Sequence, residues 1–290
     1  MTQLDYIVDV TGGRGGKVYL ILGQQRTAII DCGMAYCADR LIQNIQQVLG
    51  NKTLDYIFIT HSHYDHVGGM PYIKEQWPAC RVLGAQYAQR VFASTSALKT
   101  IRQLGEQAAA LYGAAGIMPY GETLLRVDTV VSDGTCIDLG GVRVKVIATP
   151  GHTKCSLSFL VNDVLFASES TGYKSQSGRV YPAFIVSDVE ALASIRKCQQ
   201  LNPRYVISPH YGLVENPHAY WEQCRQALEE TRAFILRMYQ EGYNEEEIFV
   251  AYEQAFRDEH SRAEQPSEAF RLNVQAMIKT VLRTAYTAQK

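Results

Sequence analysis

The chain has 290 residues, 47% of them hydrophobic and 20% charged, which is ordinary for a globular enzyme with a full apolar core. The formal net charge of −1 argues against a broad basic face, so we expect no nucleic-acid partner. Seven scattered cysteines, no signal-peptide pattern and no long apolar run predict reduced thiols, a cytoplasmic location and no membrane span.

The first part of the chain reads mainly as strands. Two apolar segments, 17–22 and 26–31, flank a glycine-containing turn and predict a β-hairpin. Apolar residues on one face of 39–49, followed by Gly50, predict a helix with a C-terminal stop. The apolar run 54–60 predicts the next strand, and this strand leads directly into a histidine cluster.

The middle of the chain begins with an alanine-rich, glycine-interrupted stretch, 86–120, which predicts a helical insertion. Strands then return. Segment 142–146 alternates apolar and polar residues, and segments 157–161 and 164–167 predict a hairpin that turns at Asn162-Asp163.

The last part of the chain is mainly helical. A helix is expected from Ser187, which has capping-box spacing to Glu190, and strand 204–208 follows it. We expect three helices after that point. Their starts are marked by Asn216-Pro217, by Asn244 with Glu247 three residues on, and by Ser267.

The densest group of metal-binding residue types lies in the run His61-Ser62-His63-Tyr64-Asp65-His66, just past the predicted strand 54–60. Alternate residues of an extended segment point the same way, so His61 and His63 can reach one point. Asp65 and His66 follow on the next turn and can reach a second point close by. Imidazole and carboxylate donors suit zinc, iron or manganese. We therefore favour a metal site over a polar surface loop.

Three further donors stand just past predicted strands: His152, Glu169 and His210. Side chains at strand ends converge at one edge of a sheet core, so we expect these residues to join the first cluster. The two remaining histidines have no such position. His218 begins a helix and His260 lies in a polar linker, and both are expected at the surface.

These segments together resemble the metallo-β-lactamase superfamily, in the right order from about residue 5 to residue 213. The matching pieces are Ile30-Asp31-Cys32-Gly33, the cluster 60–69, Thr149-Pro150-Gly151-His152-Thr153, Leu165 to Glu169, and Ser208 to Gly212. The resemblance implies an α/β fold of the αββα sandwich type. We expect residues 1–215 to form this domain, with the insertion at 86–120, and residues 216–290 to form a helical extension that packs on it.

The resemblance also implies how the donors are divided. Carried over by position, the first metal ion would take His61, His63 and His152, and the second would take Asp65, His66 and His210. Position 169 would supply a bridging carboxylate. The family usually has aspartate there and this chain has Glu169, so either bridging or binding to one ion stays open. A surface acid is the plain alternative. Cys155 could add a thiol ligand, although a structural role is favoured.

Two divalent ions, zinc first with iron or manganese as alternatives, would make water nucleophilic near neutral pH. Asp65 is expected to bind the second ion and to orient that water. Tyr173 is a candidate hydrogen-bond donor to the developing oxyanion, with a plain loop tyrosine as the competing interpretation. The expected reaction is hydrolysis of a small ester, thioester or lactone.

Other interpretations remain at this point. A glyoxalase II-like or a phosphodiester hydrolase is an alternative within the enzymes, although no basic carboxy-terminal pattern for gripping glutathione is seen. A non-catalytic or regulatory metal-binding protein of the same fold is the alternative outside them. The expected partner is a small-molecule substrate, with no membrane. A helical extension of this kind would be compatible with a homodimer.

Overall fold

The computed structural model describes residues 4–288. The start of the chain, Met1–Gln3, bears on the signal-peptide expectation and lies outside the described residues. By its contacts the chain divides into a first unit, Met1–Ala148 with Leu157–Asp163, and a second unit, Thr149–Ser156 with Val164–Lys290. Within residues 4–288, no helix is both long and apolar enough to cross a bilayer.

The first unit contains a mixed six-stranded sheet in sequence order. Its strands are β1 (Ile7–Asp9), β2 (Tyr19–Leu22), β3 (Thr27–Ile30), β4 (Tyr56–Phe58), β5 (Arg81–Gly84) and β6 (Thr129–Val130). β1 to β3 run antiparallel, which confirms the predicted hairpin, and β3 to β6 run parallel. All four residues of β3 are buried, as expected for a strand covered on both faces. The parallel strands β3 and β4 therefore end at the same edge.

The second sheet has six strands in the order β14-β13-β10-β9-β8-β7. Their bounds are β7 (Cys136–Asp138), β8 (Arg143–Ala148), β9 (Leu157–Val161), β10 (Val164–Phe166), β13 (Tyr205–Ser208) and β14 (Gly212–Leu213). β7, β8 and β9 pair antiparallel, whereas β10 and β13 pair in parallel. Two mixed sheets with helices confirm the expected α/β class.

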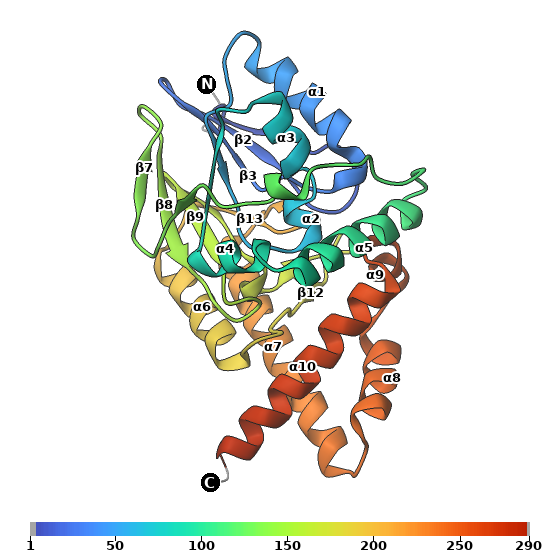
Figure 1. Ribbon diagram of the computed structural model, residues 1–290. Coiled ribbons are helices and arrows are strands. Elements are labelled where there is room, and N and C mark those ends of the chain that lie inside the picture. Colours follow the sequence, from blue (N-terminus) through green and yellow to red (C-terminus); the bar gives the residue numbers. More distant parts are fainter. Residues whose placement is uncertain (1–3, 289–290) are drawn as a thin grey trace. The chain divides into compact units, whose positions relative to one another are not determined.

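Along the chain, the helices of the first unit lie in the connections between its parallel strands. They are α1 (Ala38–Leu49), α2 (Tyr64–Val67), α3 (Met70–Gln76), α4 (Gln86–Phe92) and α5 (Thr95–Leu111), with 3₁₀ turns η1 (Ala35–Cys37) and η2 (Glu122–Leu124). α1 confirms the helix predicted over 39–49. The insertion is helical only to Leu111, because Gly113 and Gly116 adopt φ of 72° and 138°, which no helix accepts. α5 contacts α4 and α2 (Figure 1).

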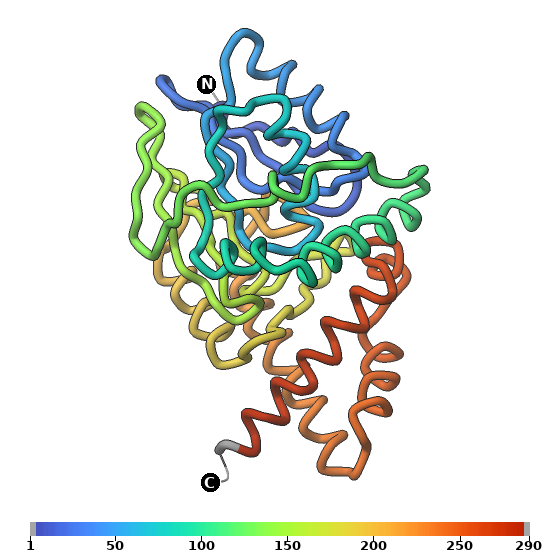
Figure 2. Tube along the Cα trace, viewed as in Figure 1, coloured from blue at the N-terminus to red at the C-terminus, as the bar shows by residue number. Residues whose placement is uncertain are grey.

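The second unit carries a short hairpin, a 3₁₀ turn and five helices. These are η3 (Glu169–Thr171), β11 (Tyr173–Lys174), β12 (Val180–Tyr181), α6 (Asp188–Gln200), α7 (Pro217–Gln240), α8 (Glu245–Phe256), α9 (Glu259–Glu264) and α10 (Ser267–Ala288). The predicted caps are confirmed. Ser187 accepts from Glu190 N, and Asn244 forms a full capping box with Glu247. Figure 2 follows the orange and red trace of α7 to α10.

One expectation for this region is wrong, because within the described part of the chain four helices rather than three follow Asn216. The additional helix, α9, contains His260, which we expected in a linker. It has six residues, too few to show a helical apolar period, and it is started by Asp258, whose Oδ1 accepts from Ser261 N at 2.7 Å.

The C-terminal helices form an aromatic core of their own. α7, α8 and α10 contact one another pairwise. Tyr252 of α8 is 2% exposed, and its ring stacks on Phe256 with centroids 4.5 Å apart. Phe234 of α7 meets Phe256 edge to face at 5.2 Å. Burial of these large rings stabilises the helices far more than their capping does.

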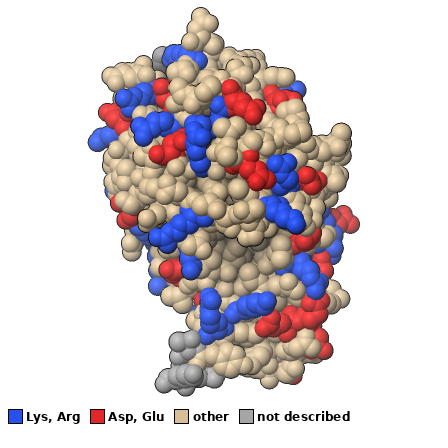
Figure 3. All heavy atoms as spheres, viewed as in Figure 1, with Lys and Arg blue, Asp and Glu red and all other residues tan. Residues whose placement is uncertain are grey.

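The surface carries both signs of charge. On the face drawn in Figure 3, Lys and Arg side chains are interspersed with Asp and Glu side chains. This mixture fits the net charge of −1. A polyanion would instead favour a continuous basic stripe.

Candidate metal centre

The donors singled out by sequence fall into two sets. His61, His63, Asp65 and His66 belong to the first unit, and His152, Glu169 and His210 belong to the second. Each set is held by its own unit, and the local structure around each explains how its side chains are oriented.

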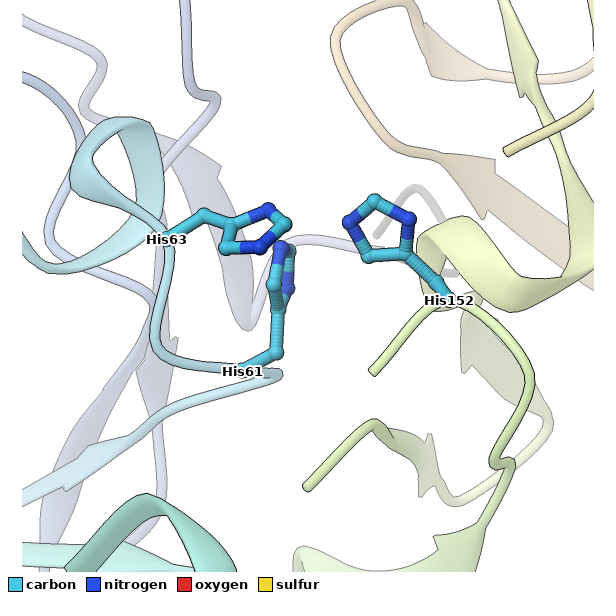
Figure 4. A group of neighbouring side chains, drawn as sticks. All are labelled: His61, His63 and His152. Atoms are coloured by element: carbon cyan, nitrogen blue, oxygen red, sulfur yellow. The ribbon is translucent and has the colours of Figure 1, made fainter. Parts of the chain in front are cut away.

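The first set lies where β4 ends and α2 begins. The backbone carbonyl of His63 accepts from His66 N at 3.0 Å and so starts the short helix. The ring centroid of His61 lies 4.6 Å from that of His63 and 4.2 Å from that of His66. Figure 4 shows the first of these ring pairs, in which the rings of His61 and His63 meet edge to face. The structure thus brings three histidines of this unit together, with Asp65 beside His66 at 3.6 Å (Nε2 to Oδ2).

A buried carboxylate, Asp31, organises this set. It follows β3, is 4% exposed and adopts a left-handed φ of 60°. Its Oδ1 accepts from Thr60 N at 2.7 Å, and its Oδ2 lies 2.8 Å from His66 Nδ1. Because a carboxylate only accepts, Nδ1 carries the proton and the lone pair of Nε2 is available to a cation. The Thr60 hydroxyl also donates to this carboxylate, at 2.8 Å from Oδ2.

Sequence reasoning missed the roles of Asp31 and Thr60. A signal was present, because an acid that directly follows an apolar strand is seldom buried without a partner. Nothing local in the sequence indicates that the partner stands 35 positions later.

Glycines let the backbone close around the first set. Cys32 N donates to His66 O at 2.7 Å, which brings the loop after β3 against the end of α2. A Cβ placed on Gly69 would lie 2.2 Å from Cys32 O, and one placed on Gly16 would lie 1.8 Å from Asp65 O. Real Cβ contacts are never that short, so glycine is required at both positions for this close approach.

In the second set, Glu169 stands between two histidines. It lies in η3 after β10 and is 5% exposed, so it is not a surface acid. Its Oε2 lies 3.3 Å from His152 Nε2, and its Oε1 lies 3.0 Å from His210 Nε2. One carboxylate thus presents a separate oxygen to each imidazole.

His152 is fixed on three sides within its unit. The ring is fully buried, and its Nδ1 lies 2.6 Å from the backbone carbonyl of Ala183. Its backbone N donates to Ser170 Oγ at 2.9 Å. A carbonyl cannot donate, so Nδ1 carries the proton and Nε2 faces Glu169 with its lone pair. The preceding Gly151 adopts φ of 133°, and a Cβ there would lie 2.6 Å from Ala191 N in α6.

His210 follows β13 in a left-handed conformation with φ of 63°, which is rare for a residue other than glycine. Gln176 Nε2 donates to its backbone carbonyl at 3.1 Å. The ring of Tyr173 meets the His210 ring edge to face, with centroids 5.4 Å apart, and it also stacks on the ring of Tyr181, with centroids 5.6 Å apart. Burial raises the pKa of the Tyr173 phenol well above its usual value, and the Glu169 carboxylate raises it further.

The two sets share one arrangement, which suits divalent metal ions. In each, a histidine donates from Nδ1 to an oxygen acceptor and turns Nε2 toward a carboxylate. A divalent cation between the Nε2 lone pair of a neutral imidazole and the carboxylate oxygen would be attracted by both. Ligand atoms each about 2.0–2.1 Å from a tetrahedral zinc ion lie roughly 3.3 Å apart. The His152–Glu169 distance of 3.3 Å has this value.

The two remaining histidines and Cys155 lie outside these two sets. His218 and His260 are exposed, as predicted. Cys155 is 1% exposed, and its Sγ lies 3.2 Å from Thr153 Oγ1. Tight burial of a small side chain of this kind fits the structural role favoured from sequence.

Comparisons with known proteins identify the family and the fold. The profile of the family described as the metallo-beta-lactamase superfamily matches residues 11–210. The metallo-beta-lactamase fold-containing protein ST1585 of Sulfurisphaera tokodaii is 31% identical over 216 residues, which cover 73% of this chain and 78% of that protein.

Two further similarities extend this finding. The hydroxyacylglutathione hydrolase of Idiomarina loihiensis is 26% identical over 176 residues, or 60% of this chain, which spans only 53% of that protein. The crystal structure of ST1585 from Sulfolobus tokodaii has a TM-score of 0.62 at 22% identity and covers 96% of this chain and 98% of its own. That structural likeness establishes the fold.

Proposed function

The chain belongs to the metallo-beta-lactamase superfamily, whose members are metal-dependent hydrolases, and on this premise we propose that it hydrolyses a small ester, thioester or lactone. The observation that carries the proposal is the arrangement common to both donor sets. Each has a histidine whose Nδ1 is bound to an oxygen acceptor and whose Nε2 faces a carboxylate.

In this proposal, His61, His63 and His152 hold one ion, and Asp65, His66 and His210 hold the second. All six residues are of the types that bind divalent metal ions. The two oxygens of Glu169 face different histidines, which favours a bridging role and fits the longer side chain at this position. Zinc suits the donor set, with iron or manganese as alternatives. Bound ions would supply a nucleophilic water near neutral pH and polarise the substrate carbonyl.

The chain's own residues would perform the remaining steps. Asp65 is half-buried, and its carboxylate would orient the attacking water and hold its proton. Tyr173, beside His210, would donate its hydroxyl hydrogen bond to the oxyanion that develops on the substrate. Asp31 would hold the proton of His66 on Nδ1, and the carbonyl of Ala183 would do the same for His152. The Nε2 atoms of both histidines would then be unprotonated and able to bind metal.

An acyl carbonyl is the favoured target because several of the similar proteins are named as hydroxyacylglutathione hydrolases, at 25–28% identity. Glutathione itself is not part of the proposal, since the matched part of those proteins is only 46–65% of their length. Phosphodiester hydrolysis and a regulatory, non-catalytic role are outcomes that the experiment below distinguishes.

Replacement of His63 with alanine is the direct test. We expect His63→Ala to lose bound metal and to lower turnover by more than about a hundredfold, because it removes a direct donor. Metal content is measured by elemental analysis. Turnover is measured with a panel of acyl thioesters, lactones and phosphodiesters, using zinc-, iron- and manganese-loaded protein.

His218→Ala is the matched control, because His218 is exposed and lies outside both donor sets. It should leave metal content and turnover unchanged. Full activity of His63→Ala would contradict the proposal. If the protein hydrolysed only phosphodiesters, it would be a phosphodiesterase instead of an acyl hydrolase. If the metal-loaded wild type hydrolysed none of the substrates, the regulatory alternative would be favoured.

A further inference from the structure

His152 depends for its orientation on a segment of the second unit, residues 183–188, that lies far from it in sequence. Ala183 O accepts the hydrogen bond from His152 Nδ1 at 2.6 Å. Three residues later, Val186 N donates to Gly151 O at 2.9 Å. The 183–188 segment thus contacts both the ring of the histidine and the backbone just before it.

Helix α10 is hydrogen-bonded to this same segment. Thr280 Oγ1 donates to Ile185 O at 3.2 Å, and the Arg283 guanidinium donates to Val186 O at 2.7 Å. Thr280 is 3% exposed, so the Ile185 carbonyl would lose a buried donor if the hydroxyl were removed. Two consecutive backbone carbonyls are therefore held by side chains one turn apart on α10.

The end of the segment is anchored as well. Asp188 is 1% exposed and begins α6. Its Oδ1 accepts from Thr284 Oγ1 of α10 at 3.0 Å, and its Oδ2 lies 3.2 Å from Arg232 Nε of α7. The 183–188 segment consequently has little freedom to shift relative to α7 and α10.

We propose that α10 is a positioning element for His152, acting through the 183–188 segment, and this rests on the metal-binding role proposed for His152. A single hydrogen bond to Ala183 O sets both the tautomer and the tilt of the ring. A shift of that carbonyl would turn Nε2 away from Glu169. Loss of the direct hydrogen bond to a metal-ligating histidine typically lowers metal affinity about 10–100-fold. The C-terminal helices would then be required for the metal centre itself as well as for any substrate pocket.

The test uses the full-length protein and removes the two α10 donors to the Ile185 and Val186 carbonyls in the double variant Thr280→Val/Arg283→Ala. We expect the zinc dissociation constant, measured by competition with a chelating dye, to rise by about tenfold or more. Hydrogen–deuterium exchange of the metal-free variant should increase over 183–188. The conservative variant Thr280→Ser/Arg283→Lys keeps both donors and should restore the wild-type affinity.

Leu272→Ala is the control on the same helix, because Leu272 is 48% exposed; it should leave zinc affinity unchanged. Wild-type affinity in a folded Thr280→Val/Arg283→Ala protein would overturn the inference and leave the proposed function standing. A wild-type protein that binds no divalent metal would overturn both. Should the double variant not fold, the single variants Thr280→Val and Arg283→Ala decide the matter, and unchanged zinc affinity in both would refute the positioning role.

Discussion

His66 and His152 are oriented by different kinds of acceptor. The Nδ1 of His66 faces the side-chain carboxylate of Asp31, whereas the Nδ1 of His152 faces the backbone carbonyl of Ala183. A charged acceptor strengthens the hydrogen bond and raises the basicity of the imidazole. The contribution of Asp31 can therefore be tested by replacing its carboxylate with an amide of the same shape.

The variant Asp31→Asn makes that change. Asparagine tolerates the left-handed φ of 60° at this position, and its Oδ1 can still accept from Thr60 N. Its amide nitrogen cannot accept from His66 Nδ1. We expect metal affinity to fall about 10–100-fold, as measured by competition with a chelator.

Asp39→Asn serves as the control, since Asp39 is an exposed residue in the first turn of α1. It should change metal affinity little. Equal metal affinities of Asp31→Asn and wild type would show that the carboxylate does not support His66.

The donors themselves could be predicted from sequence because each directly follows an apolar strand or stands on the next turn. Their acceptors could not. The link from Asp31 to His66 spans 35 positions, and the carbonyl of Ala183 has no residue type to mark it. Whether the seven predicted donors all bind metal stays a prediction.

At the scale of elements, the loop after β3 lies so close to the turn between α2 and α3 that no side chain fits between the two backbones at Gly69. Gly69→Ala would place a Cβ 2.2 Å from Cys32 O, where backbone must move to make room. We expect the free energy of unfolding to fall by about 2–3 kcal/mol, measured by urea denaturation. Metal affinity should fall too, because Cys32 N is bonded to His66 O.

Gly105→Ala is the opposite case and the control. Gly105 lies inside α5, and a Cβ there meets nothing within 4 Å. Alanine should raise the free energy of unfolding by about 0.5–1 kcal/mol, because glycine loses more backbone entropy in a helix. A destabilised Gly105→Ala, or an unaffected Gly69→Ala, would contradict this account.

The first residues of helices were the most predictable feature, because a capping side chain bonds a backbone N–H only two or three residues later in the sequence. Ser187 and Asn244 each mark a start that the structure confirms. The end of the insertion was predicted less well, since its alanine-rich pattern continues past Leu111, where the helix stops. Short elements such as α9 carry too few residues for an apolar period.

For the molecule as a whole, the free energy of unfolding at alkaline pH reports on the aromatic core of the C-terminal helices. Burial raises the pKa of Tyr252 to about 12. An unfolded chain ionises this phenol near pH 10, so the folded state retains a proton that the unfolded state loses above that pH. The contribution of Tyr252 is complete below about pH 10 and is lost as the pH rises toward 12, by at most about 1.4 kcal/mol per pH unit.

Tyr252→Phe removes this group, so its free energy of unfolding should decline less steeply than that of wild type between about pH 10 and about pH 12. Tyr243→Phe is the control, because Tyr243 is 43% exposed, and it should follow the wild-type slope. Urea denaturation at a series of pH values gives both slopes. A Tyr252→Phe protein with the wild-type slope would contradict the burial effect.

The larger organisation is only partly predictable. Contacts group the C-terminal helices with residues 149–156 and 164–215 in one unit, and a linear sequence gives no signal for a unit built from two separate segments. The division at residue 215 and the homodimer both stay predictions, and light scattering of the purified protein would decide the latter.

The contrast between the two acceptors also has a consequence for mutational tolerance. In a saturation mutagenesis library, position 31 should accept almost no substitution, since one atom group there serves both Thr60 and His66. Position 183 should accept glycine or serine freely, because any amino acid brings the same carbonyl and only a small side chain must fit its buried space. A single substitution at Asp31 therefore removes the hydrogen-bond acceptor of His66, whereas a small residue in place of Ala183 leaves the acceptor of His152 intact.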